Sequence, residues 1–328
     1  MHSVFSDGAV WPHIRVEEAL KDGLDCIAIT EHIEYQPHKA DIPHPDRRRA
    51  FEIASRAAAN TDLIVIHGSE ITRRMPPGHS NAIFITDPNK LITDDALDAY
   101  SEAKNQGGFI FWNHPDWTAH RKDGVAQLDQ MHIDLIRDGL LNGIEVVNTK
   151  GYSAEAFQIA LDNDLTIIGT SDIHGLIDWD YDVPHGHRPV TIVFSSDRTE
   201  DGIKTALFEG RTAVWHKNFL VGLPEYTEPL FQSSIKIVGA EYVGDTSVLS
   251  VQIRNHSDAE FLARNLSEYS FQEDHEILSF SAGSDTELRI KTGTRLGNVV
   301  LPLEVLNIVV APRTYLQSEL NIVVNSGE

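Results

Sequence analysis

The chain has 328 residues, with 49 aspartates and glutamates against 27 lysines and arginines, so its formal net charge is −22. This length is sufficient for one large domain and one smaller domain. So acidic a chain is not a general nucleic-acid binder, because binding to a phosphate backbone requires a basic surface. No apolar run approaches the length of a membrane-spanning helix. The single cysteine, Cys26, excludes an intramolecular disulfide and fits the cytoplasm and the periplasm equally.

Up to about residue 216, short apolar strands alternate with amphipathic helical stretches, a pattern typical of an α/β sheet or barrel with parallel strands. The first expected helix begins at Pro12 and is stopped by Gly23. Further strands are expected at 26–30, 63–67, 82–85, 109–111, 144–147, 166–168, 190–194 and 212–215, and further helices at 47–60, 93–105, 153–163 and 199–208.

Beyond Gly222-Leu223-Pro224 the hydrophobic pattern changes to a period of two, with turns rich in Asn, Asp, Gly and Ser. Strands at such short spacing predict a small all-β sandwich. We therefore expect a first domain at 1–224, a linker at 225–232 and an accessory sandwich at 233–328. The sandwich carries no histidine cluster and no glycine-rich phosphate loop, so we expect it to contribute no catalytic group.

Histidines and carboxylates occur together in six short fragments of the first domain. In parallel α/β architectures ligands gather where strands end, and most of these fragments follow an expected strand. Imidazoles together with carboxylates suit Zn, Mn or Fe, and a carboxylate can bridge two ions. The fragments are His2 to Asp7, Glu31-His32, Gly68-Ser69-Glu70, Gly78-His79-Ser80-Asn81, Asn113-His114-Pro115 and Ser171-Asp172-Ile173-His174.

From residue 1 to about residue 216 the sequence resembles the PHP (polymerase and histidinol phosphatase) phosphoesterases. The resemblance rests on the segments HSVFSDG, GLDCIAITEH, GSEIT, GHSNAIFI, FWNHP, GIEVVN and GTSDIH. It implies a distorted (β/α)7 barrel with metal ions at the C-terminal ends of the strands. The β-rich tail makes the chain similar to the family's two-domain, small-molecule phosphodiesterases.

The resemblance also implies the site residues. Two or three divalent ions (Zn, Mn or Fe) would be held by His2, Asp7, His32, Glu70, His79, His114, Asp172 and His174. One ion would be bound by His2, Glu70 and Asp172, and a second by Glu70, His79 and His114, with Glu70 as the bridge. Asp7, His32 and His174 would bind the third. Among these, Glu70, Asp172 and His174 are the expected catalytic residues.

One departure from the family pattern concerns the N-terminus. Family members open with a strand that ends in His-x-His, whereas here only the second histidine, His2, is present, with Met1 at the middle position. We expect the first strand and first histidine to lie upstream of Met1. The alternative is that the first ion has lost a ligand.

Other polar residues are expected to assist the site. Glu31 lies beside His32 and Glu145 lies in an expected strand, and both are candidates to orient metal ligands, although Glu145 has a purely structural alternative. Phosphate esters require cationic or donor groups besides metals. Arg73, Arg188 and His38 are the expected substrate contacts, with surface salt bridges and a solvated loop as the alternatives.

Together these features predict a metal-dependent hydrolase that cleaves a small phosphodiester or phosphomonoester by attack of a hydroxide that bridges two ions. His174 or His38 would protonate the leaving group. Two alternatives remain open at this point: an amide or carboxyl-ester hydrolase that uses the same metal centre, and a non-catalytic phosphate-binding protein. The expected partner is a small-molecule phosphate ester, and the sequence does not define an oligomeric state.

Overall fold

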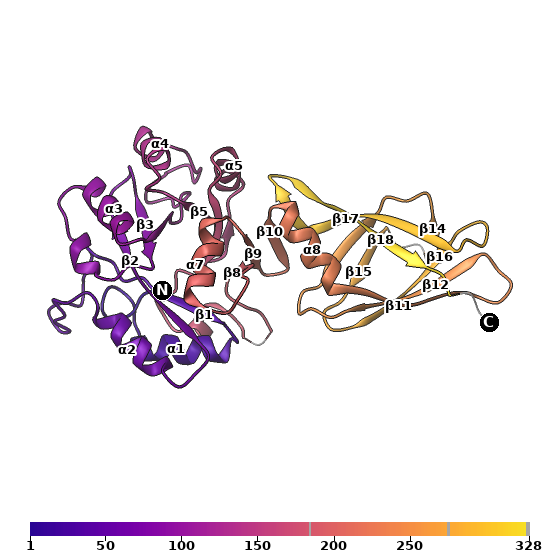
Figure 1. Cartoon of the computed structure of the whole chain (residues 1–328), viewed down its shortest axis with the longest axis horizontal. Coiled ribbons are helices and arrows are strands. Elements are labelled where there is room, and N and C mark those ends of the chain that lie inside the picture. Colours follow the sequence, from indigo (N-terminus) through magenta and orange to yellow (C-terminus); the bar gives the residue numbers. More distant parts are fainter. Residues whose placement is uncertain (184, 274–275, 326–328) are drawn as a thin grey trace. The chain divides into compact units, whose positions relative to one another are not determined.

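The computed structural model describes residues 1–183, 185–273 and 276–325. It divides into two compact units, Met1–Lys217 and Asn218–Glu328, seen in indigo to salmon and in orange to yellow in Figure 1. Residues 225–232, expected as a linker, lie within helix α8 (Pro224–Ser234) of the second unit. In the described part of the chain, no helix combines the length and apolarity needed to span a membrane.

The first unit is built on a curled, mixed sheet. Strand β3 is antiparallel to both of its neighbours, whereas β1 with β2, β4 with β5, and β5 with β7 are parallel pairs. The sheet is therefore not the uniformly parallel one expected from the alternation of elements. Its strands are β1 (Cys26–Ile29), β2 (Ile64–Thr72), β3 (His79–Ile83), β4 (Phe109–Trp112), β5 (Gly143–Asn148), β6 (Gly151–Tyr152) and β7 (Thr166–Thr170).

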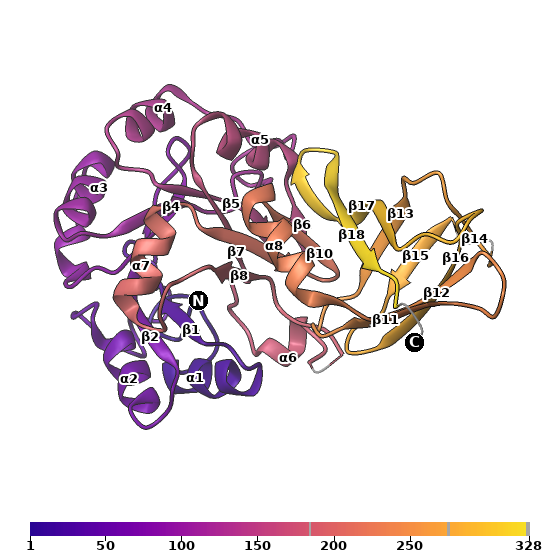
Figure 2. The same cartoon turned by 45° about the vertical axis from the view of Figure 1, so that its right-hand side comes forward.

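Helices flank these strands in Figure 2, and several of them begin at side-chain caps. The Asp95, Ser153 and Thr199 side chains accept hydrogen bonds from the first-turn N–H groups of α3, α5 and α7. The elements are α1 (Pro12–Lys21), α2 (Arg49–Ala58), the 3-10 helix η1 (Pro88–Leu91), α3 (Ala96–Asn105), α4 (Gln130–Arg137), α5 (Ala154–Asp162), α6 (Ile177–Asp180) and α7 (Glu200–Phe208), with the antiparallel strands β8 (Val190–Val193) and β9 (Thr212–His216).

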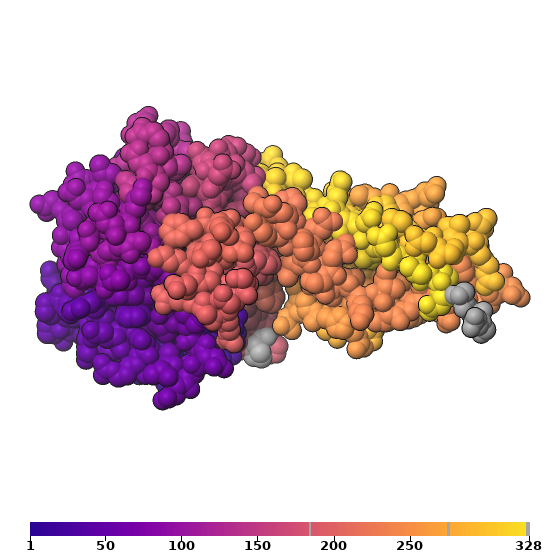
Figure 3. All heavy atoms as spheres, viewed as in Figure 1, coloured from indigo at the N-terminus to yellow at the C-terminus, as the bar shows by residue number. Residues whose placement is uncertain are grey.

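The beginning and the end of the first unit lie side by side. Arg198, just before α7, pairs with Asp25 at 2.8 Å, next to the start of β1. In the space-filling view the indigo and salmon atoms accordingly share one surface (Figure 3).

Strands β2 and β3 differ from their expected extents in a way that matters for the site. Strand β2 continues to Thr72 and β3 already begins at His79, so Glu70 and His79 lie inside strands. The expectation failed because the site-facing residues of this hairpin are polar and interrupt the apolar runs. In the register, Glu70 lies opposite Asn81 and Thr72 lies opposite His79, so all four side chains are on one face.

The second unit is an all-β domain with one N-terminal helix. One sheet centres on β17, which pairs with β10, β13 and β18, while β13 also pairs with β15. The other sheet has the order β11-β12-β16-β14. The strands are β10 (Phe219–Gly222), β11 (Ile235–Tyr242), β12 (Val248–Asn255), β13 (Phe261–Asn265), β14 (Ser270–Phe271), β15 (Ile277–Phe280), β16 (Asp285–Lys291), β17 (Asn298–Ala311) and β18 (Thr314–Val323).

Alternate residues along these strands fill the core of the second unit. In β18 every second residue from Leu316 to Ile322 is buried, and Leu249, Val251 and Ile253 of β12 are inaccessible to solvent. This period of two is what the sequence pattern indicates for a sandwich.

His67 of β2 makes the stability of the first unit depend on pH. It is 8 % exposed and stacks on Phe51 with ring centroids 4.2 Å apart, and its Nε2 has no hydrogen-bond partner. Burial, assisted by the charge of Arg48, lowers the pKa of His67 to about 4.

Because the folded-state pKa lies below the unfolded value, the contribution of His67 is complete above about pH 6.5 and is lost as the pH falls toward 4. Between pH 7 and pH 5, we therefore expect the unfolding free energy of the wild type to fall by about 2 kcal/mol more than that of His67→Leu. Urea unfolding of both proteins at the two pH values measures this. Equal pH dependence of the two unfolding free energies would contradict it.

Candidate metal centre

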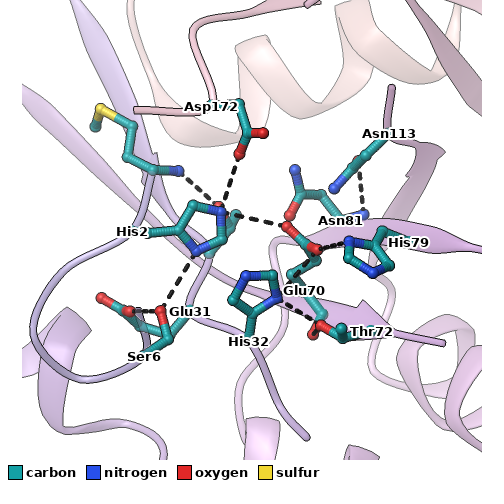
Figure 4. A network of polar contacts seen from close by, with 12 residues as sticks. His2, Ser6, Glu31, His32, Glu70, Thr72, His79, Asn81, Asn113 and Asp172 are labelled. Atoms are coloured by element: carbon teal, nitrogen blue, oxygen red, sulfur yellow. Dashed lines mark hydrogen bonds and ion pairs between the residues drawn. The ribbon is translucent and has the colours of Figure 1, made fainter. Parts of the chain in front are cut away.

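Glu70 is the centre of a buried cluster of imidazoles (Figure 4). Its carboxylate is 1 % exposed, with Oε1 at 2.8 Å from His79 Nδ1 and 3.1 Å from His32 Nδ1. The other oxygen, Oε2, lies 3.3 Å from His2 Nε2. The two oxygens of one carboxylate thus face histidines from three different segments of the chain.

His2 connects Glu70 to the last of the sequence fragments. Its Nε2 lies 3.1 Å from Asp172 Oδ1, and its ring stacks on His32 and His174 with centroids 4.4 and 4.3 Å apart. Only 1 % of His2 is exposed. The N-terminal loop and the loop after β7 therefore present their ligand candidates to the same point.

A second carboxylate, Asp7, gathers the remaining histidines. Its Oδ1 lies 3.2 Å from His174 Nε2, 3.4 Å from His32 Nε2 and 3.8 Å from His2 Nδ1. His174 is oriented by its other nitrogen, since Nδ1 is 2.7 Å from the carbonyl oxygen of Asp172. A histidine whose Nδ1–H is bound to a carbonyl offers Nε2 as a free lone pair.

The geometry of these contacts fits metal ligands better than it fits hydrogen bonds. Both oxygens of Glu70, Oδ1 of Asp7 and Nδ1 of His79 and His114 are buried without a hydrogen-bond partner, although oppositely charged groups lie near most of them. Ligands about 2.0–2.2 Å from one ion are separated from each other by roughly 3 Å. In three groups of residues, one candidate ligand atom from each member lies within 4.8 Å of the others: His2, Glu70 and Asp172; His32, Glu70 and His79; and His2, Asp7, His32 and His174.

The electrostatics of the cluster favour a cation. Burial alone would raise the pKa of Glu70, but the charge of His32 and the contacts with His2, His32 and His79 hold it well below its usual range. For His32 burial acts in the opposite direction and would lower the pKa, but Glu70 and Asp7 raise it to about 10. The carboxylates thus stabilise a positive charge on the neighbouring imidazoles. A divalent cation bound in place of the imidazole protons would be stabilised in the same way.

His114 lies beside this cluster and is held by Glu145. Its ring centroid is 5.0 Å from that of His79, and its backbone has a φ of 30°. The backbone N–H of His114 donates to Glu145 Oε2 at 2.6 Å, while Asn148 and Thr170 donate to the same carboxylate. Burial, together with the charge of Asp172, raises the pKa of Glu145 to about 8. Glu145 thus supports an unusual backbone conformation at His114.

Glu31 contacts the N-terminal loop and not the imidazole of its neighbour His32. It accepts the backbone N–H of Ser3 at 3.1 Å and the hydroxyls of Ser3 and Ser6. Ser6 in turn lies 3.4 Å from His2 Nδ1. Glu31 therefore orients the loop that carries His2 and Asp7.

The three expected substrate contacts lie outside this cluster. Arg73 binds Glu34 at 2.9 Å and the carbonyls of Thr93 and Asp94. Arg188 is 3 % exposed and its Nε donates to Asp22 at 2.7 Å, so it is better explained as a buried structural ion pair than as a substrate contact. In the described part of the chain, no recorded contact joins the His38 side chain to the cluster.

His120, which the sequence pattern did not single out, lies against the cluster. Its ring centroid is 4.8 Å from that of His79 and 4.7 Å from that of Trp117, and its Nδ1 is buried without a partner. Burial lowers the pKa of His120 to about 4, which keeps the ring neutral. The available signal was the second imidazole in the loop segment HPDWTAH, which begins at His114.

One comparison with known proteins concerns the second unit alone. A family model described as an Ig-like domain (DUF5001) matches residues 235–321, within the second unit. Among curated proteins, none matches the chain.

Two distant structures resemble part of the chain. One is a putative metal-dependent phosphoesterase from Bifidobacterium adolescentis, 20 % identical, with a TM-score of 0.42 over 53 % of this chain and 86 % of that one. The other is an amidohydrolase from Chromobacterium violaceum with bound sulfate and no metal, 16 % identical, with a TM-score of 0.39 over 54 % of this chain and 87 % of that one.

A much stronger likeness extends over both units. A two-domain protein from Bacteroides vulgatus that contains a predicted PHP-like metal-dependent phosphoesterase is 39 % identical, with a TM-score of 0.92. The match covers 98 % of this chain and 93 % of that one. With this likeness and the cluster around Glu70, the chain belongs to the PHP superfamily of metal-dependent phosphoesterases, among its members with a C-terminal β domain.

Proposed function

We propose that this protein is a metal-dependent hydrolase of small phosphate esters. The observation that carries the proposal is the carboxylate of Glu70, whose two oxygens face different sets of imidazoles. A carboxylate in this position can bind one ion through each oxygen. Family membership and the ligand groups support a divalent metal centre, and the N and O donor atoms suit Zn, Mn or Fe.

The ligand groups divide between two or three ions, in a way that differs in part from the assignment that the family resemblance implies. His2, Glu70 and Asp172 group as implied, whereas His32 lies as close to Glu70 as to Asp7. His114 lies beside His79 but outside the groups that meet the ligand distances in the described residues. We propose that it completes the coordination of the ion held by Glu70 and His79, on the mouth of a distorted (β/α)7 barrel.

Divalent ions in such a centre supply Lewis acidity toward phosphoryl oxygens and lower the pKa of water. The residues of the chain supply orientation and exclusion of solvent. Glu31 holds the loop of His2 and Asp7, Glu145 holds the backbone of His114, and the carbonyl of Asp172 fixes the ring of His174. Because His174 offers Nε2 toward Asp7, its geometry favours a ligand over a proton donor.

The charge of the whole chain favours a small substrate. With a net charge of −22, the protein repels long polyanions, and only local cations would attract a phosphate group. We therefore propose a small-molecule phosphodiester or phosphomonoester as substrate, and we propose no nucleic-acid partner.

The bridging role of Glu70 has a direct test. We expect Glu70→Ala to lose metal from both neighbouring positions, because each ion loses a ligand and the repulsion between them is no longer compensated. His38→Ala is the control, since His38 lies outside the ligand groups. Elemental analysis of the purified proteins gives the metal content per chain. Two equivalents retained by Glu70→Ala would refute the bridge.

The activity is tested with bis(p-nitrophenyl) phosphate, p-nitrophenyl phosphate, p-nitrophenyl acetate and a p-nitroanilide, using protein loaded with Zn²⁺, Mn²⁺ or Fe²⁺. We expect turnover of at least one phosphate ester, and a loss of more than about a hundredfold in kcat/KM in Glu70→Ala, because even partners of metal ligands are worth 10–100-fold. Turnover of only the acetate or anilide would replace the proposal with an amide or carboxyl-ester hydrolase. Phosphate binding without turnover of any compound would indicate a binding protein.

A further inference from the structure

The inward face of helix α1 carries charged residues where apolar residues are usual. Arg15 and Glu18 lie three residues apart on one side of the helix, and Asp22, four residues further along, is its C-cap. Arg15 is 0 % exposed, and Glu18 is also buried. Charged side chains are rarely buried in this way unless they are paired and fully hydrogen-bonded, so the hydrogen-bond partners of Arg15 and Glu18 indicate what the two residues do.

The guanidinium of Arg15 joins two segments that are far apart in sequence. Its Nε donates to the carbonyl of His2 at 2.9 Å. Its Nη1 and Nη2 donate to the carbonyls of Gly175 at 2.7 Å and His174 at 2.8 Å, and Nη2 reaches that of Ile173 at 3.4 Å. One planar fork therefore holds the backbone at residue 2 and at residues 173–175.

Glu18 fixes Arg15 in this position and extends the clamp. Its Oε2 accepts from Arg15 Nη1 at 2.8 Å, and its Oε1 accepts the backbone N–H of Ile177 at 2.8 Å. Every donor and acceptor of the pair that the structure describes is thus directed either at its partner or at a loop that carries expected metal ligands. Asp22, by contrast, binds Arg188 and contacts neither loop.

The segment after β7 needs this support because its backbone is unfavourable. Asp172 has a φ of 46°, in the left-handed region that non-glycine residues rarely adopt. The next three carbonyls, of Ile173, His174 and Gly175, converge on one point, which is repulsive unless a cation or several donors lie there. Arg15 occupies that point, while Asp172 Oδ1 is directed at His2 Nε2, 3.1 Å away.

We infer that Arg15, held by Glu18, is a positioning residue of the metal centre that sets the relative placement of His2, Asp172 and His174. The inference rests on the proposed metal-dependent function. It assigns to α1 a task beyond packing: the helix carries the side chain that aligns the N-terminal ligand loop with the loop after β7.

The test uses the full chain and Co²⁺, whose visible absorption reports the geometry of its ligands. Wild type, Arg15→Met, Arg15→Lys and Asp22→Asn are compared by Co²⁺ titration, by absorption spectrum and by thermal unfolding. Asp22→Asn is the control for loss of a buried charge at the end of the same helix, because Asp22 itself contacts neither ligand loop, although its partner Arg188 reaches Met1 Sδ at 3.5 Å.

We expect Arg15→Met to bind Co²⁺ about ten- to a hundredfold more weakly, with an altered spectrum. Arg15→Lys should give an intermediate affinity, because one ammonium group cannot span the carbonyls of His2 and of residues 173–175 as the fork does. Asp22→Asn should lose thermal stability while keeping the spectrum and affinity of wild type.

A wild-type spectrum and affinity in Arg15→Met, with only its melting temperature lowered, would overturn the inference and leave the proposed function intact. If Arg15→Met does not fold, Arg15→Lys decides, and wild-type affinity in that variant overturns the inference. A wild-type protein that binds no Co²⁺ would overturn the proposed function and the inference together.

Discussion

The first unit contains a concentration of negative charge that its own residues do not neutralise with good geometry. Glu70, Asp7 and Asp172 are withdrawn from bulk solvent to different degrees, and the nearest positive groups are imidazoles, which are neutral at physiological pH unless a carboxylate holds a proton on them. Desolvated carboxylates are costly to the fold without a counter-charge. The sheet, the loops and the buried charges of α1 all serve to keep these groups together, and a divalent cation is the simplest species that balances them.

Most ligand candidates come from the sheet or from residues that directly follow its strands. Glu70 and His79 come from a paired hairpin, His32 follows β1 and forms an isolated bridge with Glu70, and Asp172 follows β7. The N-terminal loop, by contrast, does not follow a strand of the sheet. That loop is tied by Glu31 through Ser3 and Ser6, by Arg15 through the His2 carbonyl, and by the hydrogen bond from the His2 N–H to Ile173. Groups with metal-binding chemistry are thus placed on rigid elements or on loops with several anchors.

Much of the fold and of the cluster could be predicted from the sequence, because acid–histidine fragments beside apolar strands are a local signal. The alternation of elements predicts an α/β unit and a β unit, which the structure and the Ig-like family match bear out at that level.

Local patterns could not show which residues that are distant in sequence contact each other in the fold. Arg188 lies near ligand candidates in sequence, yet its partner Asp22 is on the first helix, and the choice between substrate and ion pair depends on that distant residue. His120 likewise does not lie beside an expected strand, and only the fold brings it to His79. The antiparallel direction of β3 could not be predicted for a related reason. Its first residues are polar because they face the cluster, and in the sequence such residues are typical of a loop.

The register of β2 with β3 has a consequence for how proteins of this kind can change over time. Glu70 and His79 face the same side because the strands on either side of the turn at residues 73–78 stay in step. A shift of this pairing register by one residue would turn either Glu70 or His79 toward the opposite face of the sheet. Length variation in this turn is therefore compatible with the cluster only where the connection absorbs it and Glu70 stays paired with Asn81. The loop after His114 carries a restraint of another kind, because the ring of His120 within it packs against that of His79.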